Sequence, residues 1–287
     1  MERLFLVAHE EPDAPGTPGG RIVLLDSFTH LDKRVGLRDV VVAGSFAGTM
    51  PVGVALEHGV RATISHAAGV GREGAGIGGL GLADKWSVPA AAAETMSARM
   101  GDGRSMHGEG RIGHANRTAE GLGVRVRMAV AEAARRMLAA PPGRPILAGA
   151  LVDRSHRVVV ESSEGRIVLM GSSSFAGPGN RGDVIILSSH ASYPPAEPLI
   201  TVGARGGIFN DGGLAKDRSA VDGLPMLDAA GIPGAAVAAM SARMGDPLSS
   251  WEQGVVSVVN EAARRLGVEV GQSAQEAARR MLGAPRR

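Results

Sequence analysis

The chain has 287 residues, 44% of them hydrophobic, and a formal net charge of +2, so it is long enough for two domains with apolar cores. It has no cysteine, which excludes disulfides, thiolate metal sites and cysteine nucleophiles, and its scattered basic residues argue against a nucleic-acid partner. No apolar run approaches the roughly 20 residues of a membrane helix, and the first residues do not resemble a signal peptide, so we expect a cytoplasmic protein without a membrane partner.

The sequence repeats itself at an offset of 144 residues (240 minus 96). Two segments occur twice: Met-Ser-Ala-Arg-Met-Gly-Asp at 96–102 and 240–246, and Glu-Ala-Ala-Arg-Arg-Met-Leu at 132–138 and 276–282. A tandem duplication explains both pairs. We expect a first repeat over 1–143 and a second over 144–287, with a linker marked by the prolines and glycine of 141–145.

Each repeat begins with two short apolar runs that predict a β-hairpin, and three further strands follow. The predicted strands are 4–7, 21–25, 40–43, 62–65 and 90–93 in the first repeat, and 158–160, 166–169, 184–187, 207–209 and 235–238 in the second. A short helix or turn through residue 57 or 199, a helix over 75–85 or 220–230, and two closing helices that end at residue 138 or 282 complete each repeat.

This alternation predicts an α/β fold, in which a Rossmann-like unit with a mainly parallel sheet is duplicated in tandem and related by a pseudo-twofold axis. The segment after the second heptapeptide is expected to be helical, with Ser257 and Asn260 near one face of that helix. Asn116 aligns with Asn260 and is expected to bond the heptapeptide loop or to lie on a polar surface.

The repeated heptapeptide places polar side chains after the last predicted parallel strand of each repeat. They are Ser97, Arg99 and Asp102 in the first repeat and Ser241, Arg243 and Asp246 in the second. An arginine at the carboxyl end of a strand can bind a carboxylate or phosphate, so we expect these residues to bind substrate and Asp246 to transfer protons as well. The alternative is structural, with the arginine and aspartate bracing the glycine turn between them.

Further polar residues follow the strands of the second repeat. Ser189 and His190 come after one predicted strand, and Asn210 and Asp211 come after the next. His190 and Asp211 are candidate acid–base groups, Ser189 is a candidate nucleophile, and Asn210 is a candidate substrate ligand. The alternative is that these are ordinary turn and cap residues.

Lys216 lies in a glycine-containing turn before a predicted helix, where backbone amides and the helix dipole favour anions. It could bind an anionic substrate or act in catalysis, and the alternative is a solvated surface charge. The first repeat has Arg72 at this position, which keeps the charge and loses the titratable amine.

Together these residues predict a hydrolase, acting on a C–N bond or a related bond by acid–base chemistry, with a small carboxylate-bearing substrate. One alternative is an isomerase or racemase that uses the pseudo-twofold axis, and another is a non-catalytic binding protein. No local motif predicts a metal or a cofactor, so we expect metal-independent chemistry without a cofactor, and the sequence leaves homo-oligomerisation open.

Overall fold

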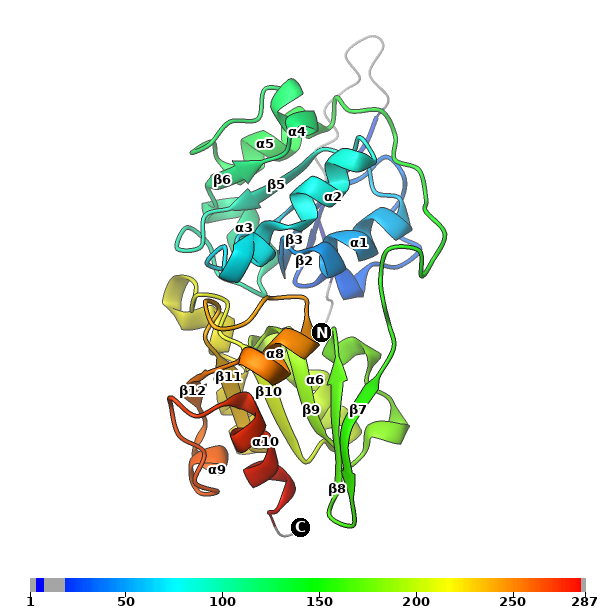
Figure 1. The fold of residues 1–287 in the computed structure, drawn as a ribbon. Helices are drawn as coiled ribbons and strands as arrows, with labels where there is room; N and C mark the ends of the chain where they lie inside the picture. The colour runs from blue at the N-terminus through cyan, green and yellow to red at the C-terminus, as the bar shows by residue number, and fades with distance from the viewer. Residues whose placement is uncertain (1–3, 8–18, 285–287) are drawn as a thin grey trace. The chain divides into compact units, whose positions relative to one another are not determined.

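The computed structural model describes residues 4–7 and 19–284, which form two compact units (Figure 1). Unit 1 contains the described residues up to 69 together with 75–153 and 215–217. Unit 2 contains 70–74, 154–214 and 218–284. Each unit therefore includes a short segment from the other half of the sequence.

Unit 1 is built on a six-stranded sheet with the order β1-β2-β3-β4-β5-β6. Its strands are β1 (Leu4–Val7), β2 (Ile22–Leu25), β3 (Val40–Phe46), β4 (Ala62–His66), β5 (Ala90–Ala93) and β6 (Ile112–Ala115). The four central strands are parallel, and the two edge strands are antiparallel to their neighbours. The helices are α1 (Thr49–His58), α2 (Gly79–Lys85), α3 (Gly103–Glu109), α4 (Arg117–Gly121) and α5 (Val130–Met137).

Unit 2 has the same arrangement, with the sheet order β12-β11-β10-β9-β8-β7. Its strands are β7 (Arg157–Ser162), β8 (Gly165–Met170), β9 (Val184–His190), β10 (Gly206–Asn210), β11 (Gly234–Val237) and β12 (Val256–Val259). The helices are α6 (Tyr193–Val202), α7 (Leu224–Ala229), α8 (Pro247–Gln253), α9 (Glu261–Arg264) and α10 (Ala274–Leu282). Again the four central strands are parallel and the two edges antiparallel.

Both faces of each sheet are covered, which explains why the central strands read as continuous apolar runs. In unit 1, Val40 and Val42 pack with side chains of α3 and α5, whereas Val41 packs on the other face with Ala55 of α1. Unit 2 has two corresponding apolar clusters of its own on the two faces of its sheet. The expectation of an α/β fold with mainly parallel sheets is confirmed.

The structure corrects the predicted helices. The expected helix over 75–85 is a 3₁₀ segment, Arg72–Ile77, followed by α2, and the expected helix over 220–230 is a 3₁₀ segment, Lys216–Val221, followed by α7. Glycines at the start of α2 and α7 allow close packing, because a Cβ at Gly79 would lie 2.5 Å from the Gly48 carbonyl oxygen.

The closing segments also differ from the prediction. Each contains three helices and an antiparallel strand, β6 or β12, where two helices were expected. Ser257 lies on β12, and Asn260 is the N-cap of α9, so the prediction that both lie on one helix is wrong. Val256–Val259 contains three valines, and such β-branched residues favour a strand.

The segment that joins the two halves is anchored on unit 1. The buried Glu57 carboxylate accepts hydrogen bonds from the backbone amides of Gly149, Leu151 and Val152 at 2.9–3.0 Å. A charged acceptor makes such bonds strong, which keeps residues up to 153 with unit 1.

The two tryptophans of the chain are divided between the units. Trp86 in unit 1 is 48% exposed, whereas Trp251 in unit 2 is 9% exposed and has the Arg279 guanidinium 5.5 Å from its ring centre. Within the described part of the chain, the helices are all too short or too polar to cross a membrane.

Candidate functional site

The heptapeptide loop is fastened to the sheet in the same way in both units. Gly101 donates its backbone N–H to the Gly44 carbonyl in unit 1 at 2.9 Å, and Gly245 donates to the Ser188 carbonyl in unit 2 at 3.0 Å. These residues correspond at the 144-residue offset. The loop therefore lies beside the carboxyl end of β3 or β9.

The heptapeptide serines brace this loop. Ser241 Oγ donates to the Ala238 carbonyl at 2.8 Å and accepts from the Val255 amide at 3.0 Å. Ser97 makes the corresponding bonds to Glu94 and Arg111. Both hydroxyl groups are thus engaged with the backbone.

The heptapeptide aspartates cap the helices that follow. Asp102 accepts from the amides of Arg104 and Ser105, and Asp246 accepts from the amide of Ser249. Burial acts to raise the pKa of Asp246, but the hydrogen bonds from Ser249 and from the Arg243 guanidinium hold it below its usual value. Asp246 is therefore ionised at neutral pH.

Each heptapeptide arginine contacts a carboxylate within its own unit. In unit 2, Arg243 lies 2.8 Å from Asp246 and 3.1 Å from Glu73, and hydrogen bonds to both raise its pKa. In unit 1, Arg99 lies 3.3 Å from Asp217. Both guanidinium groups are more than one-third exposed and can therefore reach a ligand from solvent.

His66 and Asn210 occupy equivalent positions at the ends of β4 and β10. His66 Nδ1 accepts from the Ala68 amide, and Nε2 lies 3.1 Å from the Ala98 carbonyl oxygen. Asn210 Oδ1 accepts from the Gly212 amide, and Nδ2 donates to the Ala242 carbonyl. Burial lowers the pKa of His66 to about 4, so the ring is neutral at pH 7 and holds the heptapeptide loop as Asn210 does.

Asn116 and Asn260 form a second matched pair and do not contact the heptapeptide loop. Asn260 Oδ1 accepts from the amides of Gly234 and Ala263, and Nδ2 donates to the carbonyls of Leu224 and Ile232. Asn116 makes the corresponding four bonds in unit 1. These buried amides join the last helices to the sheet.

A His–Ser pair lies at the end of β9. His190 Nδ1 and Ser192 Oγ are 2.8 Å apart, and both side chains are buried. The first half has Phe46 and Gly48 at these positions, and a Cβ at Gly48 would lie 2.2 Å from the Phe46 ring. Sequence reasoning missed Ser192, which a residue-by-residue comparison of the two halves would have revealed.

An Asp–Ser pair lies at the end of β10. Asp211 Oδ2 accepts from Ser257 Oγ at 2.7 Å, and Oδ1 accepts from the amides of Gly213 and Ala239. Asp211 and Ser257 replace Ala67 and Gly113 of the first half. Both polar pairs are therefore features of unit 2 alone.

Both pairs lie at the carboxyl edge of the unit 2 sheet. His190 and Asn210 are register partners in β9 and β10, and Asp211 follows Asn210 directly. Ser189 is also buried here, and its hydroxyl has no hydrogen-bond partner among the described residues. A buried hydroxyl without a partner is costly, and a role in catalysis is one explanation for it.

Lys216 belongs to unit 1, whereas these side chains belong to unit 2. Its ammonium group is 2.9 Å from Glu109 Oε2. The hydrogen bonds from Lys216 and Ser105 lower the pKa of Glu109. Lys216 thus has an acidic partner in unit 1, and the His–Ser and Asp–Ser pairs of unit 2 form without it.

The loops after β4 and β10 have an unusual backbone. Four consecutive residues, 68–71 or 212–215, have positive φ, as do 73 and 74 or 217 and 218. Val70, at φ 61°, is β-branched and disfavours this conformation strongly. Such strain persists only where the surrounding structure imposes it and is concentrated at functional sites.

Among the described residues, no group of three or more His, Asp or Glu side chains is placed to hold a metal ion. No protein-family model, curated protein or solved structure matches the chain.

Proposed function

We propose that the chain is a small-molecule hydrolase that acts by acid–base chemistry on a carboxylate-bearing substrate, with its active site at the carboxyl ends of β9, β10 and β11. The observation that carries this proposal is the pair of polar contacts, His190–Ser192 and Asp211–Ser257, that replace apolar residues and glycines of unit 1. A duplicated scaffold with one specialised half would differ in this way.

In the proposed reaction, His190 acts as the general base, and Ser192 holds its imidazole ring in position. His190 takes a proton from water as the water oxygen attacks the substrate carbonyl, and returns it to the leaving nitrogen or oxygen atom. Ser189 donates its unpaired hydroxyl to the developing oxyanion. Asp211, fixed by three donors, supplies a negative charge at the same strand ends.

Arg243 is the proposed ligand for the substrate carboxylate. Its contact with Glu73 shows that a carboxylate can reach this guanidinium group. Because an exposed ion pair contributes only about 0–1 kcal/mol, a substrate can displace Glu73 at little cost. Asp246, a partner of Arg243 that also caps α8, keeps the guanidinium group oriented during this exchange.

We further infer that the two halves arose by tandem duplication of one Rossmann-like unit. The identical heptapeptides and the same strand order in both units support this inference. So do the equivalent hydrogen bonds that His66 and Asn210 make in their own units, and those that Asn116 and Asn260 make. A pseudo-twofold relation between the halves belongs to the same proposal.

The test replaces the polar pairs of unit 2 with the residues of unit 1. The variants are His190→Phe/Ser192→Gly and Asp211→Ala/Ser257→Gly. Each would be assayed with a panel of N-acyl amino acids, dicarboxylic acid monoamides and their ester analogues. We expect kcat/KM to fall by roughly 10²–10⁴-fold in the first variant, which removes the general base.

A Phe46→His/Gly48→Ser variant makes the reciprocal change in unit 1 and should retain full activity. Unchanged circular dichroism would exclude unfolding as the cause of any loss. Turnover by the His190→Phe/Ser192→Gly variant at the wild-type rate would overturn the proposed site. Carboxylate binding that needs Arg243 but is accompanied by no turnover would instead identify a binding protein.

A further inference from the structure

A loop from the first half of the sequence lies beside the proposed active site. This loop, residues 70–74, belongs to unit 2. The Arg72 amide donates to the Ala239 carbonyl at 2.8 Å, and the Ala239 amide donates to Asp211 Oδ1 at 2.9 Å. A single residue, Ala239, therefore connects the loop to an acid of the proposed site.

The loop brings a second arginine to the heptapeptide of unit 2. Arg72 Nη1 donates to the Ser241 carbonyl at 2.8 Å, and Arg243 follows two residues after that serine. Glu73 contacts both guanidinium groups, with Oε2 3.1 Å from Arg243 Nη1 and Oε1 3.5 Å from Arg72 Nε. One carboxylate thus engages the two arginines, one with each oxygen atom.

Both arginines also have partners other than Glu73. Arg243 donates from Nε and Nη2 to Asp246 Oδ2 at 3.2 and 2.8 Å, which leaves Nη1 for Glu73. Arg72 is held by the Ser241 carbonyl. Because of these bonds, the guanidinium groups keep their orientation when Glu73 moves away.

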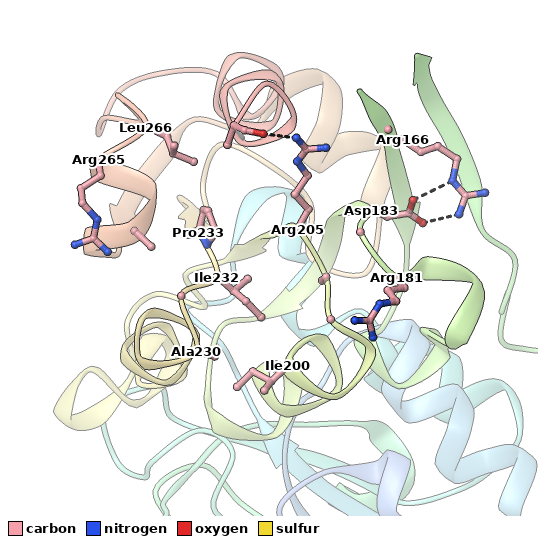
Figure 2. Close-up of a pocket in the computed structure, with 17 residues that line it drawn as sticks. Arg166, Arg181, Asp183, Ile200, Arg205, Ala230, Ile232, Pro233, Arg265 and Leu266 are labelled. Atoms are coloured by element: carbon pink, nitrogen blue, oxygen red, sulfur yellow. Dashed lines mark hydrogen bonds and ion pairs between the residues drawn. The ribbon is translucent and has the colours of Figure 1, made fainter. Parts of the chain in front are cut away.

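The exposure of Glu73 distinguishes its contacts from a more buried ion pair of unit 2. Figure 2 shows that pair, in which Arg166 lies 2.7 Å from Asp183. The Asp183 side chain is 5% exposed, whereas that of Glu73 is 56% exposed. An exposed ion pair contributes little to stability, but separating a buried one is costly. Glu73 is therefore the carboxylate that another carboxylate can replace.

The corresponding loop, residues 215–217, makes similar contacts in unit 1. Its aspartate, Asp217, lies 3.3 Å from Arg99 of the first heptapeptide. Its cation, Lys216, has a further acidic partner, because Glu109 of α3 lies 2.9 Å from the ammonium group. The loop cation of unit 1 is therefore paired with a carboxylate outside the loop.

Unit 2 lacks that carboxylate. Gln253 stands at the position of Glu109 and accepts a hydrogen bond from Ser249 Oγ at 3.0 Å. Among the described residues, the acidic partner of Arg72 is its neighbour Glu73 alone. When Glu73 moves away, Arg72 is free to bind an anion.

This difference lies in the direct partner of the loop cation and not in the charge of the helix. Helix α3 carries Arg104 as well as Glu109, whereas α8 has Leu248 at the position of Arg104 and carries Glu252. Helix α8 is thus no more basic than α3.

We propose that Arg72 and Arg243 together bind the substrate carboxylate, and that Glu73 occupies their shared site until substrate displaces it. This inference rests on the proposed function, in which Arg243 alone binds the carboxylate. Glu73 presents its carboxylate at the end of a short methylene chain, so the substrate that fits carries a terminal carboxylate on such a chain. The first half of the sequence thereby supplies a specificity-determining residue to a site whose acid–base groups come from the second half.

The test measures the binding of glutarate to the full chain by isothermal titration calorimetry. Glutarate has terminal carboxylates on a short methylene chain and no bond to hydrolyse, so its binding is measured apart from turnover. We expect Glu73→Gln to tighten binding about fivefold, because the competing carboxylate is lost. Arg72→Gln should weaken binding about fivefold, and Arg72→Lys, which keeps the charge, should weaken it less.

Gln253→Glu installs the acid of unit 1 and should also weaken glutarate binding about fivefold, since Arg72 gains a carboxylate partner outside the loop. The uncharged analogue glutaramide should bind neither the wild type nor this variant.

Two variants are controls. Asp217→Asn makes the equivalent change in unit 1 and should leave the affinity unchanged, because Lys216 stays paired with Glu109. Arg265→Gln removes an exposed arginine from a recess at the amino ends of the strands, where Asp183 immediately precedes β9, and should also have no effect (Figure 2).

The inference is overturned if glutarate does not bind, if Glu73→Gln and Arg72→Gln leave its affinity unchanged, or if Asp217→Asn or Arg265→Gln changes it equally. Kinetics with glutarate monoamide separate this inference from the proposed function. Turnover that needs His190 but has the same KM in Glu73→Gln and Arg72→Gln refutes the inference alone. The expected binding pattern without turnover of any substrate in the panel refutes the hydrolase and supports the two-arginine site.

Discussion

At the residue scale, two different side chains make the same contacts in the two units. His66 and Asn210 each accept a backbone amide two residues ahead and contact a carbonyl of the heptapeptide loop. The bonds are alike, but only the imidazole can titrate. Because burial lowers the pKa of His66 to about 4, its neutral form is the one that fits the folded chain.

His66 should therefore make the protein acid-sensitive. Its folded pKa lies below the unfolded value of about 6.5, so stability is complete above pH 6.5 and is lost as the pH falls towards 4. At pH 4.5 the loss from this group is about 2.5 kcal/mol. We expect His66→Asn to remove this loss while leaving stability at pH 7 within about 1 kcal/mol.

Urea unfolding at pH 7 and pH 4.5 measures this difference. The reciprocal variant Asn210→His is the matched control and should make the protein more acid-sensitive. If His66→Asn leaves the pH dependence of the unfolding midpoint unchanged, His66 is not the buried neutral group that its contacts indicate.

At the scale of elements, the loops after β4 and β10 adopt a backbone conformation that their residue types disfavour. A residue other than glycine in the left-handed region costs roughly 1–2 kcal/mol, yet Val70 and Leu214 both adopt it. The same conformation at corresponding positions in both units indicates that the surrounding contacts impose it.

Glycine at position 70 should therefore give a more stable protein than alanine, which reverses their usual order in helices and strands. We expect Val70→Gly to be more stable than Val70→Ala by about 1 kcal/mol, as measured by urea unfolding. The same pair of substitutions at the exposed helical position 136 should show the usual order, with alanine more stable. Equal stability of the two variants at position 70 would contradict the left-handed conformation.

Glu57 accepts backbone hydrogen bonds from the linker, and their effect on the linker can be measured. Thr201 stands at the corresponding position of the second half. Glu57→Thr should raise amide exchange at Gly149, Leu151 and Val152 at least tenfold, because each loses a charged acceptor. The Gly245 amide in unit 2 should keep its protection, and unchanged exchange at all four amides would show that the linker is held by other contacts.

The strands could be predicted from the sequence because runs such as Val184–Leu187 are apolar, short and separated by turns. The strand β6 was missed because Ile112–Ala115 has one β-branched residue and a glycine. Left-handed loops could not be predicted from Val70, whose preference opposes the observed φ. Ser192 could not be predicted from adjacency to His190, which pointed to Ser189. The hydrogen-bond partner of His190 lies two residues ahead.

At the scale of the whole molecule, each unit has its own apolar clusters on both faces of its own sheet. Such cores can unfold in separate transitions. We expect calorimetry to resolve two, and Asn116→Ala and Asn260→Ala to lower different ones. Each substitution leaves buried amides and carbonyls without partners, which costs roughly 2–4 kcal/mol.

The two alanine variants are controls for each other, because the lost bonds correspond one to one. A single transition that both variants lower equally would mean that the chain unfolds as one cooperative body. The sequence could predict two repeats from the heptapeptides, but not that residues up to 153 stay with unit 1, since that depends on the contacts of Glu57.

The division of the tryptophans has a spectroscopic consequence. An indole ring emits at longer wavelength in water than in an apolar environment, so the exposed Trp86 and the buried Trp251 contribute red and blue components of the emission. Unfolding of unit 2 should shift the blue component to the red, whereas unfolding of unit 1 should leave it unchanged. Intrinsic fluorescence therefore follows the unfolding of unit 2 without a label.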